Sequence, residues 1–216
     1  MTPFHDRAAG GRELAKRLRS YAGRADAIVL ALPRGGVPVG FEVARELGLP
    51  LDIVLVRKLG VPGREELAMG AVASSGLYFI DQWLVRRLEI APEEIDAVVE
   101  RESQEVARQE TVYRGNRPRP EVRDKTVICV DDGLATGASM RVAVAGLRKA
   151  RPARIIVAVP VAAPQVAAEL RDVADDVIVV HLPHNFRAVS LWYEDFSQTT
   201  DEEVRDLLAR AASPKA

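Results

Sequence analysis

The sequence predicts an α/β protein whose central, mostly parallel sheet carries helices on both faces. Short, uninterrupted apolar runs are typical of strands that are buried on both sides. The chain has five such runs, at residues 27–32, 51–56, 127–130, 154–159 and 177–180. Segments with helical spacing of apolar residues separate most of these runs, as expected of right-handed crossovers between parallel strands. The 216 residues suffice for one domain of this class.

The first half is predicted to begin with an amphipathic helix that ends near Gly23. Its apolar side chains recur at helical spacing with basic residues between them: Leu14, Leu18 and Tyr21. After the strand at 27–32, the glycine turn at 33–36, Pro-Arg-Gly-Gly, leads into a second helix. The apolar positions of that helix share one face: Val39, Val43 and Leu47.

The middle of the chain is predicted to leave the sheet. Residues 57–64 are polar, basic and glycine-bearing, which indicates a mobile loop. Residues 67–73 and 77–80 are expected to pair as a hairpin around Ser74-Ser-Gly76. The charged stretch 81–113 carries a thin apolar stripe, which predicts a helical excursion. A linker rich in proline and arginine, 114–120, then leads back to the sheet.

The second half alternates regularly between strands and helices. Helices are expected at 138–149 and 165–171, between the last three predicted strands. This alternation is the main reason to expect parallel strands. The tail, 211–216, is expected to be frayed.

Composition excludes several function classes. Hydrophobic residues make up 48% and charged residues 28% of the chain, which argues against disorder. The net charge of -1 provides no long-range field that would attract nucleic acid or an anionic membrane. No segment resembles a secretory signal or a membrane span, so a cytoplasmic location is expected. Cys129 is the single cysteine, which excludes an intramolecular disulfide and a zinc–cysteine site.

The segment most informative about chemistry is 127–140, Val-Ile-Cys-Val-Asp-Asp-Gly-Leu-Ala-Thr-Gly-Ala-Ser-Met. A buried strand here delivers two adjacent carboxylates, Asp131 and Asp132, into a loop of small residues that opens a helix. Carboxylates at the carboxyl end of a parallel strand suit ribose hydroxyls or a hydrated Mg²⁺. The backbone amides of the small residues, with the positive end of the helix, can hold a phosphate dianion. Taken separately, Asp-Asp-Gly could be only a turn and Thr-Gly-Ala-Ser only a helix cap.

In this chain the acid pair and the loop of small residues follow one another directly after a buried strand. Together, residues 130–139 resemble the phosphoribosyl-pyrophosphate (PRPP) signature of type I phosphoribosyltransferases. Residues 32–37 occupy the place of the pyrophosphate-binding loop of that family, and residues 57–64 the place of its flexible loop. The three matches cover about residues 25–185. The resemblance is greatest to small bacterial proteins known only as predicted or putative phosphoribosyltransferases, which share the Pro-Arg-Gly-Gly, Val-Arg-Lys and Asp-Asp-Gly-x-Ala-Thr-Gly-Ala-Ser patterns.

The resemblance implies a type I phosphoribosyltransferase fold in which residues 1–216 form a single domain. A helical insertion is expected at 81–120, and a small hood with a C-terminal helix at 181–216. Four residues are expected to be catalytic: Asp131, Asp132, Arg34 and Lys58. The two aspartates would bind the ribose hydroxyls and, directly or through water, Mg²⁺.

The remaining site residues bind the two ends of PRPP, according to the same resemblance. The 5′-phosphate would be held by the loop that opens the helix: Ala135, Thr136, Gly137, Ala138 and Ser139. Pyrophosphate would be held by the first loop and the flexible loop: Arg34, Gly35, Gly36 and Lys58. Lys58 could equally be part of a solvated basic loop.

The acceptor stays open at this point. Ala135 stands where hypoxanthine–guanine type enzymes carry an aspartate that accepts a proton from the base, which disfavours a 6-oxopurine acceptor. Adenine and orotate enzymes resemble the chain at this position, but the rest of the sequence selects neither. Aromatic side chains of the hood could stack on a planar base, or pack the C-terminal segment onto the sheet: Phe186, Trp192 and Tyr193. His181 and His184 lack a third metal ligand and are expected to shape a loop.

The expected function is Mg²⁺-dependent transfer of the 5-phosphoribosyl group from PRPP to a nitrogenous base or other amine, with release of pyrophosphate. Such an enzyme is a glycosyltransferase of nucleotide metabolism. Its expected partners are PRPP and a small acceptor such as a nucleobase, with a homodimer as a possible assembly and no nucleic acid or membrane. The alternative is a non-catalytic PRPP- or nucleotide-binding regulator, because fold does not dictate function.

Two other nucleotide- or phosphate-handling classes fit the sequence poorly. A response-regulator receiver would carry its acid pair near the start of the domain, and here the pair lies at mid-chain. A P-loop nucleoside-triphosphatase would need a Gly-Lys-Ser/Thr sequence, which the chain lacks.

Overall fold

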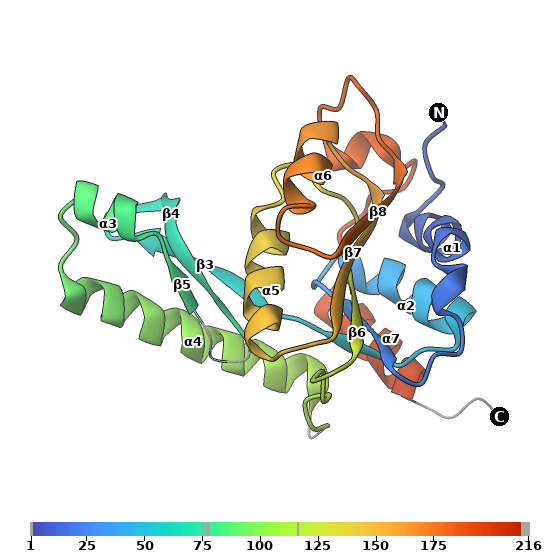
Figure 1. The fold of residues 1–216 in the computed structure, drawn as a ribbon, viewed down its shortest axis with the longest axis horizontal. Coiled ribbons are helices and arrows are strands. Elements are labelled where there is room, and N and C mark those ends of the chain that lie inside the picture. The colour runs from blue at the N-terminus through green and yellow to red at the C-terminus, as the bar shows by residue number, and fades with distance from the viewer. Residues whose placement is uncertain (1, 75, 77, 116, 213–216) are drawn as a thin grey trace.

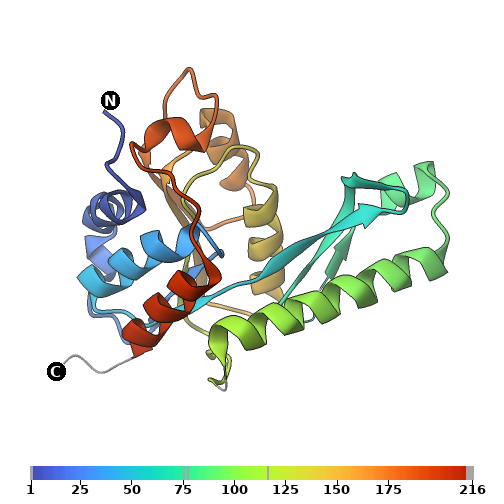
Figure 2. The same ribbon diagram turned by 180° about the vertical axis from the view of Figure 1, so that it is seen from behind.

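The computed structural model describes residues 2–74, 76, 78–115 and 117–212, and these form two separate sheets (Figures 1 and 2). The main sheet has five parallel strands in the spatial order β2-β1-β6-β7-β8. In chain order they are β1 (Ala27–Ala31), β2 (Leu51–Ile53), β6 (Thr126–Val130), β7 (Arg154–Val161) and β8 (Asp176–His181). Each overlaps one of the five apolar runs, so the predicted α/β class is confirmed.

Helices cover both faces of the main sheet (Figure 1). One face carries α1 (Arg7–Arg17), α2 (Gly36–Leu47) and α7 (Asp201–Ala212), and the other carries α5 (Ala138–Lys149) and α6 (Pro164–Leu170). Alternate side chains of β1 supply the two layers of the core. Val29 and Ala31 pack with α1 and α2, whereas Ile28 and Leu30 pack with α5 and α6. The first helix is shorter than predicted, because a 3-10 turn at Arg19–Tyr21 follows it.

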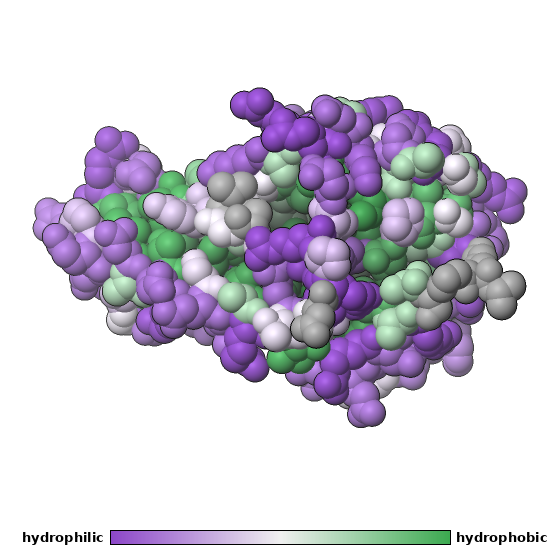
Figure 3. Space-filling view, turned by 90° about the horizontal axis from the view of Figure 1, so that it is seen from below, coloured by the Kyte–Doolittle hydropathy of each residue, from purple (hydrophilic) through white to green (hydrophobic). Residues whose placement is uncertain are grey.

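An arm projects from this core, at the left of Figure 1. It is built from β3 (Val56–Val61), β4 (Arg64–Ala73), β5 (Tyr78–Ile80), α3 (Gln82–Arg87) and α4 (Pro92–Arg114). Helix α4 runs along the arm and buries its apolar stripe, including Val98 and Val106, in the same core layer as β3 and β4. Hydrophobic residues bordered by hydrophilic ones appear on the arm surface at the left of Figure 3. The predicted helical excursion is confirmed as α3 and α4.

The prediction of a mobile loop at 57–64 is wrong. Most of it is β3, which pairs antiparallel with β4 across a turn at Pro62 and Gly63. Leu59 and Val61 are buried on alternate positions of β3, and this burial stabilises an extended backbone despite the glycines. The predicted strand 51–56 is likewise divided, since β2 ends at Ile53 and the chain enters the second sheet at Val56.

Other predictions for the middle and the end of the chain largely agree with the structure where it describes them. The hairpin is confirmed, because β4 pairs antiparallel with β5, with Gly70 opposite Ile80; Ser75 and Leu77 lie outside the described residues. The linker was predicted at 114–120, but Arg114 is the last residue of α4; residues 117–120 have no regular structure. Most of the tail predicted to fray, 213–216, is outside the described residues. Within the described part of the chain, the search for a helix able to cross a membrane finds none.

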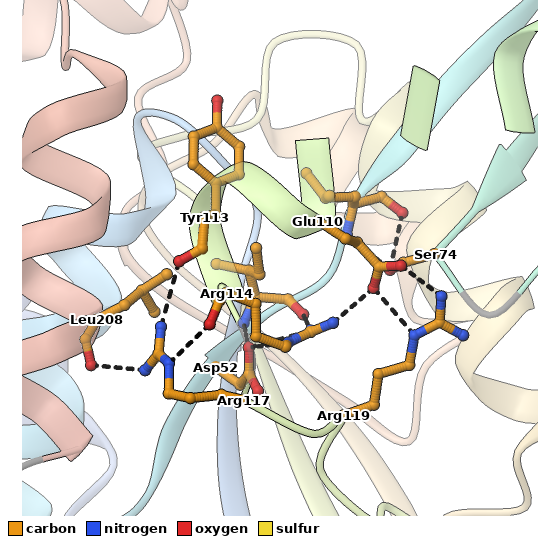
Figure 4. Close-up of polar contacts among 10 residues, drawn as sticks. Asp52, Ser74, Glu110, Tyr113, Arg114, Arg117, Arg119 and Leu208 are labelled. Carbon is orange, nitrogen blue, oxygen red and sulfur yellow. Dashed lines mark hydrogen bonds and ion pairs between the residues drawn. The ribbon is translucent and has the colours of Figure 1, made fainter. Parts of the chain in front are cut away.

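The arm joins the core at a buried cluster of charged side chains (Figure 4). Arg114, at the end of α4, is only 6% exposed, and its guanidinium contacts Asp52 of β2 at 3.1 Å and Glu110 at 2.6 Å. It also donates to the carbonyl oxygen of Ile53 at 3.2 Å. Arg117 donates to the carbonyl oxygen of Leu208 in α7 at 2.9 Å. These contacts fix the root of the arm to β2 and α7.

Candidate functional site

The site lies where the order of the main sheet changes direction. β1 and β6 are neighbours, with Ala31 opposite Val130, but β1 is followed by β2 on one side and β6 by β7 on the other. In open α/β sheets, such a switch point leaves a crevice at the carboxyl ends of the strands, where ligands bind. The two predicted binding loops, which follow β1 and β6, meet at this point.

Two glycines allow these loops to meet. A Cβ atom on Gly35 would lie 2.1 Å from Asp132 Oδ2, and one on Gly36 would lie 2.8 Å from the carbonyl oxygen of Val130. Any larger residue at either position would therefore displace the acid pair or the loop. The peptide bond between Pro33 and Arg34 in the same loop is cis. The Pro-Arg-Gly-Gly segment is thus packed directly on the carboxylates that follow β6.

The two carboxylates have different surroundings. Asp131 lines the cleft described below, and its Oδ1 accepts a hydrogen bond from the amide of Asp132 at 2.8 Å. Asp132 Oδ2 accepts from Arg7 Nε at 2.9 Å, and its carbonyl oxygen accepts from the Tyr193 hydroxyl at 2.5 Å. Burial, followed by the charge of Asp132, raises the pKa of Asp131 well above its usual range. Burial also raises the pKa of Asp132, although Arg7 opposes this effect.

The predicted phosphate loop enters α5 through Gly137, whose φ of 69° is in the left-handed region. Gly137 is buried, and a Cβ atom there would lie 2.6 Å from Val166 Cγ1. The other four predicted residues of this loop are exposed: Ala135, Thr136, Ala138 and Ser139. The loop is fixed on β7, because the amide of Leu134 donates to the carbonyl oxygen of Val161 at 3.0 Å. Exposed amides at the start of a twelve-residue helix suit a phosphate group.

A cleft of about 410 Å³ lies between the core and the arm. Arg34, Asp131 and Ser139 come to it from the core. The arm contributes residues of β3 and α4, among them Arg57, Arg108, Gln109 and Tyr113, and Asp201 comes from the start of α7. Lys58, which was predicted to contact pyrophosphate, is exposed on β3 and is not part of this described lining. Its neighbour Arg57 lines the cleft instead.

Carboxylates of the protein pair with all three arginines of the cleft. Arg57 Nε lies 2.6 Å from Glu102, and Arg108 contacts Glu105 through two hydrogen bonds of 2.8 Å. The Arg108 guanidinium lowers the pKa of Glu105 to about 2.

The third arginine has a looser partner. Arg34 Nη1 lies 3.7 Å from Asp201 Oδ1, and that oxygen also accepts from the Tyr113 hydroxyl at 2.7 Å. Burial, followed by this contact with Asp201, raises the pKa of Tyr113 to about 12. The cleft thus combines cationic side chains with a buried carboxylate.

The three aromatic residues predicted to bind the acceptor lie elsewhere. Tyr193 is buried, with its ring 5.6 Å from that of Phe4 and 5.3 Å from that of Phe196. Trp192, in a 3-10 turn at Val189–Trp192, and Phe186 are partly buried beside them. None of the three contributes to the described lining of the cleft. Their placement favours packing of the C-terminal segment, the alternative that the sequence left open.

Sequence reasoning missed five of the residues described above, among them Arg57, which lay in the predicted mobile loop without an assigned role. Arg7 stands outside every motif, and it reaches Asp132 across 125 positions of sequence. Arg108 and Tyr113 belong to the charged helix α4, whose pattern does not distinguish a solvated face from a cleft wall. Asp201 opens the acidic start of α7, which the sequence marks only as a helix N-terminus.

The carboxylates can be tested for a fit to Mg²⁺. The described residues contain no group of three or more His, Cys, Asp or Glu side chains that could hold a metal by themselves. Mg²⁺, however, is usually bound by one or two carboxylates together with substrate phosphates and water. Asp131 lies in the cleft wall, in the same cleft as Ser139 of the phosphate loop. This donor set fits a magnesium ion that arrives with a phosphorylated ligand.

Comparison with known proteins agrees with this geometry. Residues 3–194 match the family model described as the phosphoribosyl transferase domain. Two Mycobacterium tuberculosis proteins, from strains H37Rv and CDC 1551, are each named "putative phosphoribosyl transferase" and are 40% identical over 211 residues, 98% of this chain. The chain spans about half the length of these relatives, 47%.

Solved structures show the same fold. The crystal structure of TT1426 from Thermus thermophilus is similar, with a TM-score of 0.85, 39% identity, and coverage of 98% of this chain and 100% of that one. The AQ2163 protein from Aquifex aeolicus shares the fold at 12% identity and a TM-score of 0.52, with coverage of 97% and 85%. Since the matched region contains both loops and the acid pair between them, the chain belongs to the phosphoribosyl transferase domain family.

Proposed function

We propose that the chain is a Mg²⁺-dependent phosphoribosyltransferase that transfers the 5-phosphoribosyl group from PRPP to a nitrogenous base or other amine and releases pyrophosphate. One observation supports this most directly. The glycine loop after β1 is packed on the acid pair after β6, and the phosphate loop follows within five residues at the start of α5. A diphosphate site, a ribose site and a monophosphate site therefore adjoin in the order in which PRPP carries these groups.

Each part of the site has a distinct task in this reaction. Breaking the bond between C1 of the ribose and the pyrophosphate oxygen leaves positive charge on the ribose and negative charge on pyrophosphate. The guanidinium of Arg34 and the amide of Gly35 stabilise the negative charge. The amide of Gly36, which was also predicted to bind pyrophosphate, donates to the carbonyl oxygen of Leu32 at 3.0 Å. The carboxylate of Asp131 binds the ribose hydroxyls and favours the positive charge. Mg²⁺, when bound through Asp131 and the phosphates, neutralises part of the charge on the leaving group.

The 5′-phosphate is anchored at the opposite end of the site. Residues 135, 136, 138 and 139 of this loop are exposed at the start of α5, where the positive end of a helix suits an anion. Holding this phosphate aligns C1 with the incoming amine and converts an encounter of two molecules into a step within one complex. Arg57 and Arg108, which line the cleft, extend the positive surface around the pyrophosphate. The contact predicted for Lys58 stays a prediction.

Several finer predictions stay predictions. A nucleobase is the preferred acceptor class, and Trp192 and Phe186 are the hood residues that could still contact it. A cytoplasmic location, a homodimer and the organisation of residues 1–216 as one domain with a hood at 181–216 also await tests. The alternative function, a non-catalytic PRPP-binding regulator, would bind PRPP like the enzyme but would not transfer its phosphoribosyl group.

Calorimetric titration with PRPP, with and without Mg²⁺, tests the proposal. Mg²⁺-dependent binding, followed by release of pyrophosphate with at least one nucleobase or amine, is the expected result. Binding without release from any acceptor would favour the regulator. A folded protein that binds no PRPP would contradict both functions.

A further inference from the structure

Arg7, the first residue of α1, lies outside the recognised loops but reaches the acid pair. Its Nε donates to Asp132 Oδ2 at 2.9 Å, and its Nη1 donates to the carbonyl oxygen of Ser197 at 2.7 Å. The same guanidinium lies over the ring of Phe196, 3.9 Å from its centroid. The Arg7 side chain is only 12% exposed and that of Asp132 only 16%. A charge pair so well shielded from water is more strongly coupled than one on the surface.

The contacts of Asp132 come from three separate parts of the chain. Arg7 approaches from the N-terminal helix, and the Tyr193 hydroxyl holds its carbonyl oxygen from the C-terminal segment. Gly35 of the glycine loop packs so closely on Oδ2 that no side chain would fit there. Arg7 and Gly35 together crowd Oδ2, so Oδ1 is the oxygen of Asp132 better placed to serve a ligand. Asp131 contacts no arginine among its described hydrogen bonds and ion pairs, and it lines the cleft.

We propose that Arg7 is a positioning residue for PRPP binding: it holds the carboxylate of Asp132 in one orientation against the glycine loop and ties the segment 193–197 to the same point. The inference rests on the proposed function. It assigns the two aspartates unequal roles, with Asp131 as the main ligand of the ribose and Asp132 as the group that keeps the loops in register. It also makes α1 and the C-terminal segment parts of the PRPP site.

A purely structural role is the competing explanation. Arg7 joins α1 to the C-terminal segment through Ser197 and Phe196, and this contact alone could stabilise the fold. The two roles differ in their dependence on Asp132. A positioning residue loses its effect on PRPP affinity when its carboxylate partner is removed, whereas a structural staple keeps its effect.

The experiment is a double-mutant cycle on PRPP affinity with Arg7→Met, Asp132→Asn and the two combined, measured by calorimetry with Mg²⁺. Arg7→Met is expected to weaken PRPP binding roughly 10-fold in the native background and less than about 2-fold in the Asp132→Asn background. Arg7→Lys keeps the charge but not the planar fork, so it should recover part of the lost affinity. Arg12→Met, on the same helix and paired with Glu42 at 3.9 Å, is the matched control and should bind PRPP like the native protein.

The outcomes separate this inference from the proposed function. Native protein that does not bind PRPP overturns the proposed function itself. If the native protein binds PRPP, two outcomes overturn the positioning role alone. One is an unchanged PRPP affinity in Arg7→Met, and the other is an equal loss of affinity from Arg7→Met in the native and Asp132→Asn backgrounds. If Arg7→Met does not fold, Arg7→Lys with and without Asp132→Asn completes a second cycle. An equal effect of the lysine in both backgrounds would then overturn the role.

Discussion

The two walls of the cleft are built in different ways. The core wall consists of loops at the ends of two adjacent parallel strands, and the groups that we propose bind PRPP there are backbone amides, Asp131 and the loosely paired Arg34. The arm wall is mainly one side of α4 with the start of β3, and its cations, Arg57 and Arg108, form close ion pairs with glutamates. An anion must displace a carboxylate to gain a full contact with the arm, but only needs to enter the site to reach the core amides. The core wall should therefore supply most of the affinity and chemistry.

The most severe test of this comparison removes the charge of the core wall. Replacing both aspartates, Asp131→Asn with Asp132→Asn, should reduce turnover about 1,000-fold or more, because the positive charge on the ribose loses its stabilising carboxylates. Pyrophosphate release under saturating PRPP measures the effect. Asp96→Asn, an exposed position on α4, serves as control. Turnover within 10-fold of native in the double variant would remove the acid pair from the mechanism.

The next test loosens the arm at its root. Arg114→Met leaves the partly buried Asp52 without its cation and leaves Glu110 with Arg119 as its one described partner, so the free energy of unfolding should fall by about 3 kcal/mol. Denaturant unfolding measures this change. Arg101→Met, which removes an arginine that is 62% exposed, should cost less than about 1 kcal/mol. A loss for Arg114→Met no larger than for Arg101→Met would show that the cluster does not fix the arm.

A direct comparison of one arginine from each wall sharpens the argument. Arg34→Ala should weaken binding of pyrophosphate and PRPP roughly 10- to 100-fold, because charge-assisted contacts to phosphate are lost. Arg108→Ala should weaken it less, by roughly 3-fold, because this arginine is already neutralised by Glu105. Calorimetric titration with pyrophosphate gives both values. Equal losses for the two variants would contradict the ranking of the walls.

The smallest expected effect is the change in stability caused by Asp131→Asn. This variant should stabilise the folded protein although it should lower the activity. Burial and Asp132 raise the pKa of Asp131, so the folded protein holds this proton more tightly than the unfolded chain. Stability is thus lost as pH rises from the unfolded pKa through the higher folded value. Asp131→Asn should therefore raise the melting temperature at pH 7 by a few degrees, and the difference should shrink toward pH 4. A lower melting temperature for the variant at pH 7 would contradict the cause given for the shift.

The core wall could be predicted from the sequence because its parts are contiguous. The segment 130–139 contains strand end, acid pair and phosphate loop within ten residues, and 33–36 is complete by itself. The arm wall could not, because β3 is extended only through pairing with β4 and burial against α4, contacts that local composition does not encode. Local composition alone, with glycine and proline within 57–64, favoured a loop, because the contacts that make β3 a strand come from distant parts of the sequence.

Single long-range contacts were equally invisible. Nothing near Arg7 indicates an aspartate 125 residues away, and nothing near Tyr193 indicates that its hydroxyl donates to the carbonyl oxygen of Asp132. Aromatic composition suggested an acceptor site at 186–193, whereas Phe4 and Phe196 cover the ring of Tyr193. Such contacts depend on how α1 and the C-terminal segment cross the sheet.

The root of the arm has a consequence for how such a protein changes in evolution. The chain leaves the main sheet after Ile53, and the arm ends at Arg114, whose guanidinium donates to the carbonyl oxygen of Ile53 at 3.2 Å. When the two ends of a segment meet, doubling its length adds only about 0.6 kcal/mol of chain entropy. Insertions, deletions or an exchanged arm can then be accommodated without altering the strands that carry the glycine loop and the acid pair.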